Sequence, residues 1–475
     1  MNIVVRICMT EDYKSTSNIQ PAEVLLYSRN VGNLICSKVG RRGLVVTGGY
    51  SSSTGKWIRT SCNPDDIGDF LQYVAWLGCV SHEGRFVEFA VRQVALWNEF
   101  LRMPSGFYHP FYDAERDNLP TRASLRPVYP HYNVDTLFGL VALYRLTKRE
   151  LFLASANRLC DGLLRFGLSP KGFVYTSVFP WLAIPVPKRG QIMIRPQTCG
   201  LYIEELCELF EITGCERYLD GARKIARACI GAGSFVKRGF FVDFWFPFLG
   251  RARTPTASLM KTNTNMLFGL LALYRTLKES VIESAIIRNI DALSSLQSSE
   301  GAFYKAWDTK LSVVASYEVS KTHNHAMIDA LIEAYLTLGD DNCLERAKSC
   351  ADYWLAAQSK IGLFPESTRG QQGWNSSVLD SHVDLLTVLL KLYGLTRQRR
   401  YLDSFLMGMQ GLLRYHTING DWAFKVDYVT GALVDDTMAV KFLGGLLRTL
   451  LFTHEFLIGK DPYQDAILHS LARDR

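Results

Sequence analysis

A thirteen-residue segment occurs twice in this chain, and the two copies begin 130 residues apart. Residues 133–145 read NVDTLFGLVALYR and residues 263–275 read NTNMLFGLLALYR, so nine of the thirteen positions are identical. Such a repeat is typical of folds in which one supersecondary unit is copied along the chain. We therefore expect the 475 residues to follow the repeat rather than to divide into several ordinary domains.

A series of glycines recurs along the chain at about half of this 130-residue interval. Each glycine precedes aromatic or aliphatic residues. The series consists of Gly43, Gly106, Gly172, Gly239, Gly301, Gly362 and Gly420, with spacings between 58 and 67 residues. A glycine can adopt the positive φ that turns a chain after a helix. We expect the short apolar run after each glycine to form a strand-like loop.

Two kinds of helical segment alternate between these loops. The first kind is apolar on several faces, which predicts burial, and the second carries one charged face, which predicts exposure to solvent. The segments expected to be buried are 66–77, 134–147, 198–213, 264–277, 325–338, 383–396 and 437–452. Further helices are expected near 21–38 and 462–472. The near-equal period and the long loops favour a closed double ring over an open solenoid.

This arrangement resembles the six- and seven-hairpin (α/α) toroid enzymes, which include many glycoside hydrolases, the N-acylglucosamine 2-epimerases and several polysaccharide lyases. The resemblance runs from about Pro21 to the C-terminus and is architectural. It implies an all-α fold, an (α/α)6–7 barrel of repeated helical hairpins with short strand-like loops at one end. Residues 1–60 would supply an outer helix and the first loop, and residues 61–475 would form the catalytic toroid of the same domain.

Composition excludes several other classes of protein. The formal charge of +7 is spread along the chain without a basic block, which argues against a nucleic-acid partner. The N-terminus lacks a continuous apolar core of a signal peptide, and no later run is long enough to span a membrane. Eleven cysteines without a CxxC pair favour a reducing compartment, so we expect a cytoplasmic protein. No cofactor or metal is predicted, and nothing indicates an oligomeric state.

All inner helices of such a ring begin at the same end, so the residues at these junctions should gather around one opening. The junction residues are Asp65, Asp66, His131, Tyr132, Asn133, Asp135, Gln197, Thr198, Asn263, Asn265, His323, Asn324, His325, Asp380, His382, Asp384, Asp435 and Asp436. A second set follows the glycines and consists of Asp113, Asp243, Asp308, Glu366 and Asp427. Helix capping is the competing interpretation, and it accounts for Asn133, Asn263, Thr198 and Asp436 without a substrate.

The leading hypothesis is a carbohydrate-active enzyme, a glycosidase, because hydrolysis of a glycoside requires two carboxyl groups. Glu366 follows an apolar run that could exclude water from it, as a general acid requires, and Asp308 or Asp436 would then be the second catalytic carboxylate. Aromatic rings can stack on sugar rings. The expected substrate-binding residues are Tyr132, Asp135, Asn265, His323, Trp307, Trp374, Trp422 and Asp380. The tryptophans could equally fill the loops.

Two alternatives remain open from the sequence. The junction histidines, above all His325 and His382, favour a sugar epimerase or isomerase, or a uronate polysaccharide lyase, in which a histidine moves a proton next to a carbonyl group. A toroid can also bind a glycan or a protein without catalysis. In each of the enzymatic interpretations the expected partner is a mono- or oligosaccharide substrate.

Overall fold

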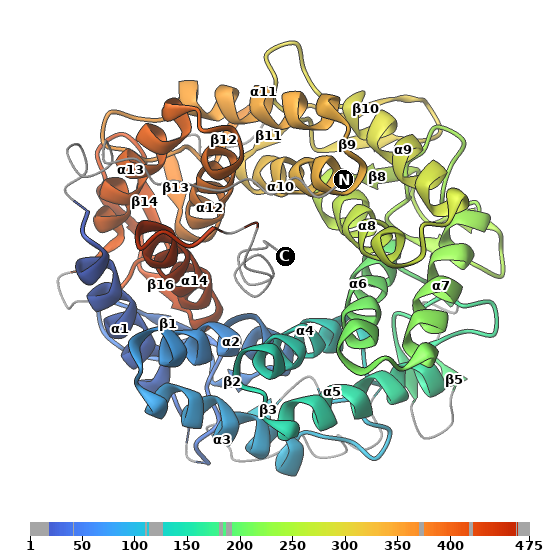
Figure 1. The fold of residues 1–475 in the computed structure, drawn as a ribbon, viewed down its shortest axis with the longest axis horizontal. Coiled ribbons are helices and arrows are strands. Elements are labelled where there is room, and N and C mark those ends of the chain that lie inside the picture. The colour runs from blue at the N-terminus through green and yellow to red at the C-terminus, as the bar shows by residue number, and fades with distance from the viewer. Residues whose placement is uncertain are drawn as a thin grey trace.

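Two concentric rings of seven α-helices make up the part of the chain that the computed structural model describes (Figure 1). These residues are 19–40, 42–109, 112–113, 127–179, 184–186, 192–369, 375–417, 421–461 and 463. The inner ring consists of α2 (Pro64–Ser81), α4 (Pro130–Thr147), α6 (Pro196–Thr213), α8 (Asn265–Leu277), α10 (Lys321–Leu338), α12 (Leu379–Thr396) and α14 (Val440–Leu457). The outer ring consists of α1 (Pro21–Ser37), α3 (Gly84–Phe100), α5 (Glu150–Gly162), α7 (Glu216–Gly231), α9 (Ser280–Ser294), α11 (Asp341–Ala357) and α13 (Arg399–Leu412).

The two ends of the described chain meet and close the ring. Helix α14 packs against both α12 and α2, and α1 lies along α14. Strand β1 (Gly49–Ser51) pairs antiparallel with β16 (Thr437–Ala439), with Tyr50 opposite Met438. Ser51 Oγ also donates a hydrogen bond of 2.7 Å to Asp436 Oδ2. The predicted all-α closed toroid is therefore confirmed.

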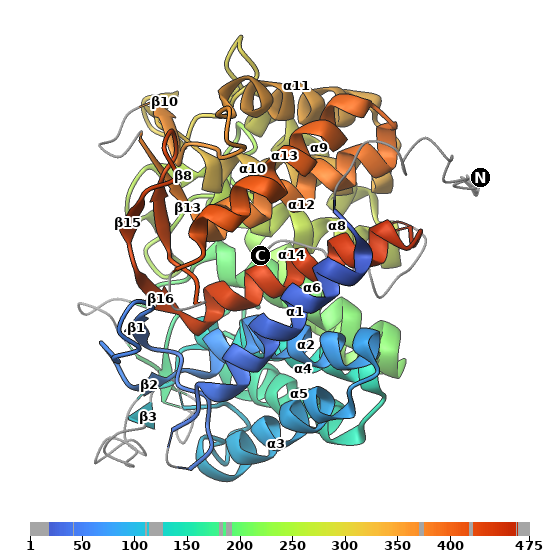
Figure 2. The same ribbon diagram turned by 90° about the vertical axis from the view of Figure 1, so that its left-hand side faces the viewer.

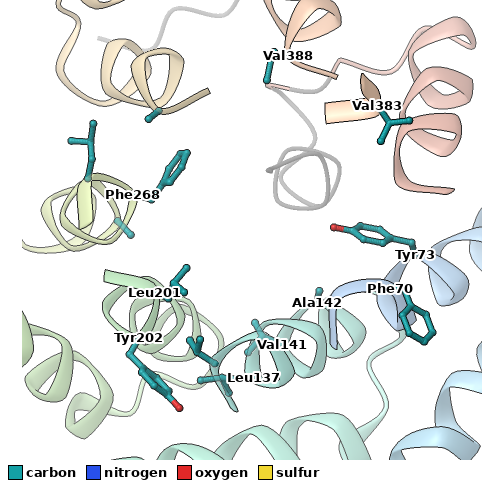
Figure 3. Close-up of a cluster of buried hydrophobic side chains, with 14 of the residues drawn as sticks. Phe70, Tyr73, Leu137, Val141, Ala142, Leu201, Tyr202, Phe268, Val383 and Val388 are labelled. Carbon is teal, nitrogen blue, oxygen red and sulfur yellow. The ribbon is translucent and has the colours of Figure 1, made fainter. Parts of the chain in front are cut away.

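The inner helices are buried on nearly all sides, as their sequences predict. In α12 every residue from Ser381 to Leu392 is buried, although the segment includes His382, Asp384 and Lys391. Figure 3 shows Leu137, Val141 and Leu201 packed between neighbouring inner helices. Helices α2, α4 and α6 begin with a proline at their first position, where the fixed φ of proline favours the helix.

Short strands gather at the end of the ring where the inner helices begin (Figure 2). Besides β1 and β16 they are β2 (Ser61–Cys62), β3 (Tyr112–Asp113), β4 (Val178–Phe179), β5 (Ile184–Pro185), β6 (Trp245–Phe246), β7 (Arg251–Ala252), β8 (Thr256–Ser258), β9 (Ala306–Asp308), β10 (Val313–Ser316), β11 (Val319–Ser320), β12 (Ser367–Arg369), β13 (Ser376–Val378), β14 (Lys425–Asp427) and β15 (Leu433–Asp435). They pair antiparallel as β2–β3, β4–β5, β6–β7, β8–β9–β10, β11–β12 and β13–β14–β15.

The glycines that mark the period turn the chain after each outer helix. Six of them have φ between 81° and 102°, whereas Gly420 lies outside the described residues, as does most of the segment 462–472. In five of these six loops the residue two places after the glycine forms an isolated antiparallel bridge, as Tyr108 does with Arg102 and Phe303 with Gln297. The predicted strand-like loops are thus real but very short.

Asparagines near the start of the inner helices fasten these loops to the ring. Asn133 Oδ1 accepts from the backbone N–H of Tyr108 at 2.7 Å, and its amide donates to the Tyr108 carbonyl at 3.3 Å. Asn263 and Asn324 bind Phe241 and Phe303 in the same way. The capping interpretation of Asn133 and Asn263 is therefore wrong, because neither residue is an N-cap: their side chains bind the preceding loop and donate to the carbonyls of the N-cap residues Tyr129 and Ser258.

Capping is also wrong for the other two residues that it was expected to explain. Thr198 lies inside the first turn of α6, and its hydroxyl lies 3.4 Å from His131 Nδ1. Asp436 precedes β16, a strand of three residues that separates it from α14. The sequence pattern places the start of this last helix three residues too early, because the apolar strand continues directly into the apolar helix.

Glycines inside the 130-residue repeat allow neighbouring inner helices to touch backbone to backbone. A Cβ at Gly269 of α8 would lie 2.2 Å from the Gly200 carbonyl oxygen of α6, and a Cβ at Gly139 of α4 would lie 2.5 Å from the Gly68 carbonyl oxygen of α2. Backbone atoms cannot move aside as a flexible side chain can. The repeated Gly is therefore required by helix packing.

Gly269→Ala is expected to lower the free energy of unfolding by about 3 kcal/mol, because the added methyl group must push two inner helices apart. Urea unfolding followed by circular dichroism measures the change. Gly231→Ala in α7 is the matched control, since nothing lies within 4 Å of its Cβ position. The control should be neutral or stabilising by up to about 1 kcal/mol. Equal effects of the two substitutions would contradict the packing argument.

Candidate functional site

A cavity of about 180 Å³ lies inside the ring at the end where the inner helices begin. It is lined by Asp69, Tyr73, Phe138, Met260, Thr322, Asp380, Asp384, Lys441, Phe442, Gly445 and Arg448. Most of these residues occupy the second, sixth or ninth position of an inner helix, the spacing that keeps side chains on one face of a helix. Residues far apart in the sequence thus form one wall.

Carboxylates and cations alternate along this wall. Lys441 Nζ lies 3.2 Å from Asp66 Oδ1, and Arg448 donates to Asp384. Burial opposes the charge of Lys441, but the carboxylates of Asp66, Asp69 and Asp380 outweigh it and raise the pKa of the lysine. The positive charges allow several carboxylates to share a small volume.

One carboxyl group in the first turn of α2 has a pKa raised above neutral pH. Burial, together with the negative charges of Asp66 and Asp69, raises the pKa of Asp65 to about 8. Asp65 occupies the second position of α2, which corresponds to the cavity-lining Asp380 and Lys441 on their helices. The first turn of α2 therefore carries both charged and neutral carboxyl groups.

Glu366 lies next to the cavity, between the first turns of α10 and α12. Thr322 Oγ1, which lines the cavity, donates to Glu366 Oε1 at 2.8 Å, and Ser381 Oγ donates to Oε2 at 2.5 Å. Lys321 Nζ lies 3.8 Å from Oε2. The apolar run before Glu366 predicted apolar surroundings for its carboxylate. That prediction is wrong, because two hydroxyl donors and a cation surround it. Such donors stabilise a charged carboxylate.

Lys321 itself is completely buried behind Glu366. Its ammonium group donates to the carbonyls of Phe364 and Val378 and to Ser377 Oγ, at 3.2, 3.4 and 3.2 Å. Burial lowers the pKa of Lys321 to about 8, against the opposing charges of Glu366, Asp384 and Asp380. The lysine joins α10 to the loop and strand that carry Glu366.

The four junction histidines face different surroundings. His382 occupies the fourth position of α12, as Asn133 and Asn324 do on their helices, and its Nε2 lies 3.2 Å from the Gly408 carbonyl oxygen of α13. The ring packs against Phe364 and Tyr415, and burial lowers its pKa to about 3. His382 therefore points toward the outer ring, and it is not among the residues that line the cavity.

His325, His323 and His131 lie closer to the cavity wall. The buried His325 has Nε2 at 3.6 Å from Asp384 Oδ2. His323 Nδ1 contacts Ser320 Oγ, and burial, with the charges of Lys305, His325 and Lys261, lowers the pKa of His323 to about 3. Burial and the charge of Arg195 lower the pKa of His131 to about 4. These last two imidazoles are neutral near pH 7.

The expected site residues of the loops are held by local structure. Asp308 accepts the backbone N–H groups of Lys310 and Leu311 in the β9–β10 turn, each at 2.8 Å. Trp307 stacks on Phe240 with ring centres 5.3 Å apart. Trp422 is 2% exposed and packs edge-on against His416. Trp374 lies outside the described residues.

Asp436, Tyr132, Asp135 and Asn265 are not among the described residues that line the cavity. Ser51 and Ser53 donate to Asp436 and lower its pKa, so this carboxylate connects the two ends of the ring. Tyr132 packs against Tyr129 and His131. Asp135 and Asn265 contribute backbone carbonyls to the close contacts with Gly68 and Gly200. Of the predicted catalytic and substrate-binding residues that the structure describes, Asp380 alone lines the cavity, together with the junction residue Asp384.

The sequence analysis did not predict Asp69, Lys441 and Arg448 as site residues. Lys441 lies in the first turn of its helix, whereas Asp69 and Arg448 lie about one and two turns further along theirs. A usable signal was present, because a charged residue in an otherwise apolar inner helix must be paired or face a polar cavity. In the segments around Asp69 and Arg448 the neighbours on both sides are almost all apolar. Reading the second, sixth and ninth positions of each inner helix identifies them.

Another hollow, of about 770 Å³, lies on the outer surface between α11 and α13. Its charged residues pair with one another, as Arg400 does with Asp352 at 2.8 Å and Lys348 with Glu345 at 2.6 Å. The central cavity is the better candidate, because several helices direct polar side chains into it. Within the described residues no group of three His, Cys, Asp or Glu side chains is placed to hold a metal ion, and no helix is long and apolar enough to cross a membrane.

Comparison with solved structures confirms the fold. An α-1,2-mannosidase from Trichoderma reesei superposes with a TM-score of 0.65 and 12% identity, over 91% of this chain and 92% of that chain. A cellobiose 2-epimerase from Bacillus thermoamylovorans has a TM-score of 0.58 and 14% identity, over 74% and 95%. A D-mannose isomerase has a TM-score of 0.58 and 11% identity, over 91% and 98%.

The chain thus has the (α/α) toroid architecture that the sequence resemblance implied. No protein-family model matches the sequence, and no curated protein matches it significantly. At identities this low the likeness defines the fold, and the chemistry must be argued from the site.

Proposed function

We propose that this protein is a carbohydrate-active enzyme that hydrolyses glycosides in the central cavity. The observation that carries the proposal is the convergence of Asp69, Asp380 and Asp384 on one cavity, with Glu366 held next to it by Thr322. Tyr73, Phe138 and Phe442 supply aromatic surface in the same wall. Carboxylates that bind hydroxyl groups and aromatic rings that cover the apolar face of a sugar are the features that a carbohydrate requires.

Hydrolysis requires one ionised and one protonated carboxyl group. We assign the ionised role to Glu366, because its surroundings are donors, and the proton-donating role to the first turn of α2, where Asp65 retains its proton. Glu366 would activate water or attack the anomeric carbon, while the acid protonates the leaving oxygen. This assignment reverses the general-acid role that the sequence suggested for Glu366. The toroid neighbours named as a mannosidase and as sugar isomerases support a sugar substrate in either case.

Epimerisation or isomerisation of a sugar is the second candidate. It is favoured by His325 beside Asp384, because a histidine paired with a carboxylate can move a proton at a carbon next to a carbonyl group. His131 and His323, which are neutral near pH 7, could also accept such a proton. We rank it second because His325 is itself buried and is not among the described residues that line the cavity.

Proton NMR in D2O separates the candidates with the full-length protein and a panel of glycosides and free sugars. New reducing ends without deuterium on carbon support hydrolysis. Deuterium next to the carbonyl carbon without new reducing ends would reject hydrolysis in favour of epimerisation. Sugar binding without either change would reject both reactions and leave a binding toroid.

A further inference from the structure

Helices α6 and α8 lie across the ring from α12 and α14 (Figure 1), and basic residues stand near the starts of both helices. We use the name basic arc for Arg195 at the start of α6, Arg253 between β7 and β8, and Lys261 in the π-helical turn η4 (Leu259–Thr264) before α8. The guanidinium carbons of Arg195 and Arg253 lie 5.2 and 5.4 Å from the centre of the Phe244 ring. One aromatic side chain therefore holds two positive charges near each other.

No carboxylate forms an ion pair with the basic arc within the part of the chain that the structure describes. Asp243 acts on Arg195, but its Oδ1 already accepts from Ser258 Oγ and Thr262 Oγ1, each at 2.6 Å. Lys261 is exposed and forms no ion pair with a described residue. Burial lowers the pKa of Arg195, against the opposing charges of Tyr132 and Asp243. A bound anion beside Arg195 would favour its charged form.

The basic arc opens onto the same mouth as the carboxylates. Lys261 stands two residues before Asn263, as His131 does before Asn133 and Thr322 before Asn324, and the adjacent Met260 lines the cavity. The charge of Lys261 acts on both His131 and His323 and contributes to the lowering of their pKa values. Lys261 is thus close to the first turns of α4 and α10, the inner helices on either side of α6 and α8.

We propose that the sugar processed in this cavity carries an anionic group, a phosphate or a carboxylate, which the basic arc binds. Arginine side chains bind such groups with paired N–H donors, and the start of α6 adds the positive end of a helix dipole. The carboxylates across the ring then face the uncharged glycosidic bond. This inference rests on the proposed function, because it names the class of substrate for the same cavity.

Isothermal titration calorimetry with the full-length protein at constant ionic strength tests the proposal. The probes are glucose, glucose 6-phosphate, glucuronate and inorganic phosphate. We expect at least one anionic sugar to bind about tenfold or more tightly than glucose. The two anionic sugars distinguish a phosphate from a carboxylate substrate. Equal affinity for charged and neutral sugars, or no binding of any of the three anions, overturns the proposal.

Charge-removing variants locate the binding site. Arg195→Met combined with Lys261→Met should abolish the preference for the anionic sugar. Arg165→Met combined with Lys360→Met is the matched control, since both residues are exposed and Arg165 also stacks on an aromatic ring, Phe166. A preference that survives the first pair overturns the proposal. Lys261→Met alone, on an exposed side chain, gives the same test if the double variant does not fold.

The two proposals can fail separately. Hydrolysis of neutral glycosides without any preference for charge would overturn the basic-arc proposal and leave the proposed function intact. Conversely, tight binding of an anionic sugar by the basic arc, in a protein that produces no new reducing ends from any glycoside, would overturn the proposed hydrolysis alone.

Discussion

Glu366→Gln should lower kcat/KM for the best glycoside substrate by about 10³-fold. Glutamine keeps the size of the side chain and its contacts with Thr322 and Ser381, but it can neither carry the charge nor accept a proton. A colorimetric assay of released sugar measures the loss. Circular dichroism and the urea midpoint establish that the variant is folded, so that the loss can be assigned to the missing carboxylate.

Asp308→Asn is the matched control for this prediction. Asp308 is also an acid expected from the sequence to be catalytic, but its carboxylate accepts the N–H groups of a turn. We expect its activity to stay within about twofold of the wild type, because an amide oxygen can accept the same bonds. A large loss in Asp308→Asn together with full activity in Glu366→Gln would refute the assignment.

Lys391→Met should lower the free energy of unfolding by about 3–5 kcal/mol, because it leaves the Asp329 carboxylate buried without its counter-charge. Lys391 Nζ lies 2.7 Å from Asp329 Oδ1, and both side chains are at most 1% exposed. Lys391 lies in the second half of α12 and Asp329 at the middle of α10, and neither is among the described residues that line the cavity. Urea unfolding followed by circular dichroism provides the measurement, while hydrolysis at low temperature should change little.

Two comparisons make the ion-pair prediction specific. Lys391→Met combined with Asp329→Leu removes both charges and should recover most of the lost stability, since a buried pair contributes little beyond satisfying its own members. Arg399→Met breaks an exposed pair with Asp403, at 45% and 57% exposure, and should cost less than about 1 kcal/mol. A full loss in the double variant would show that packing, not charge, controls this part of the ring.

The fold was predictable because the residues that recur along the chain each serve one structural purpose. Loop glycines such as Gly239 and Gly301 adopt positive φ, and the repeated Gly269 touches the backbone of the next inner helix. Helices buried on every side can only form an inner ring. The beginning of α14 was harder to place, because β16 and the helix are both apolar and have no polar residue between them.

The site was only partly predictable, because the sequence indicates where an inner helix begins but not the direction of each side chain. Asp380 and His382 are two residues apart on α12. Asp380 lines the cavity, whereas His382 turns toward α13 and occupies the position of the loop-binding asparagines. Charged residues deeper in the helices, such as Asp69 and Arg448, need the three-dimensional register before they can be assigned to the cavity.

Loop residues were the least predictable part. Trp307 and Trp422 are the aromatic residues expected to hold a sugar, yet both are buried against neighbouring rings, because a short loop has few apolar residues with which to cover the end of the ring. A tryptophan in a loop can serve either purpose, and only the packing around it distinguishes them.

The contact between β1 and β16 has a consequence for biosynthesis. Ser51 and Asp436 are 385 positions apart, and a Cβ at Gly444 of α14 would lie 2.2 Å from Phe70 of α2, so the last inner helix packs directly on the first. While the ribosome is still translating the last hairpin, α2 has no neighbour on that side and its apolar surface stays uncovered. A nascent chain must therefore be protected from aggregation until nearly its whole length has emerged.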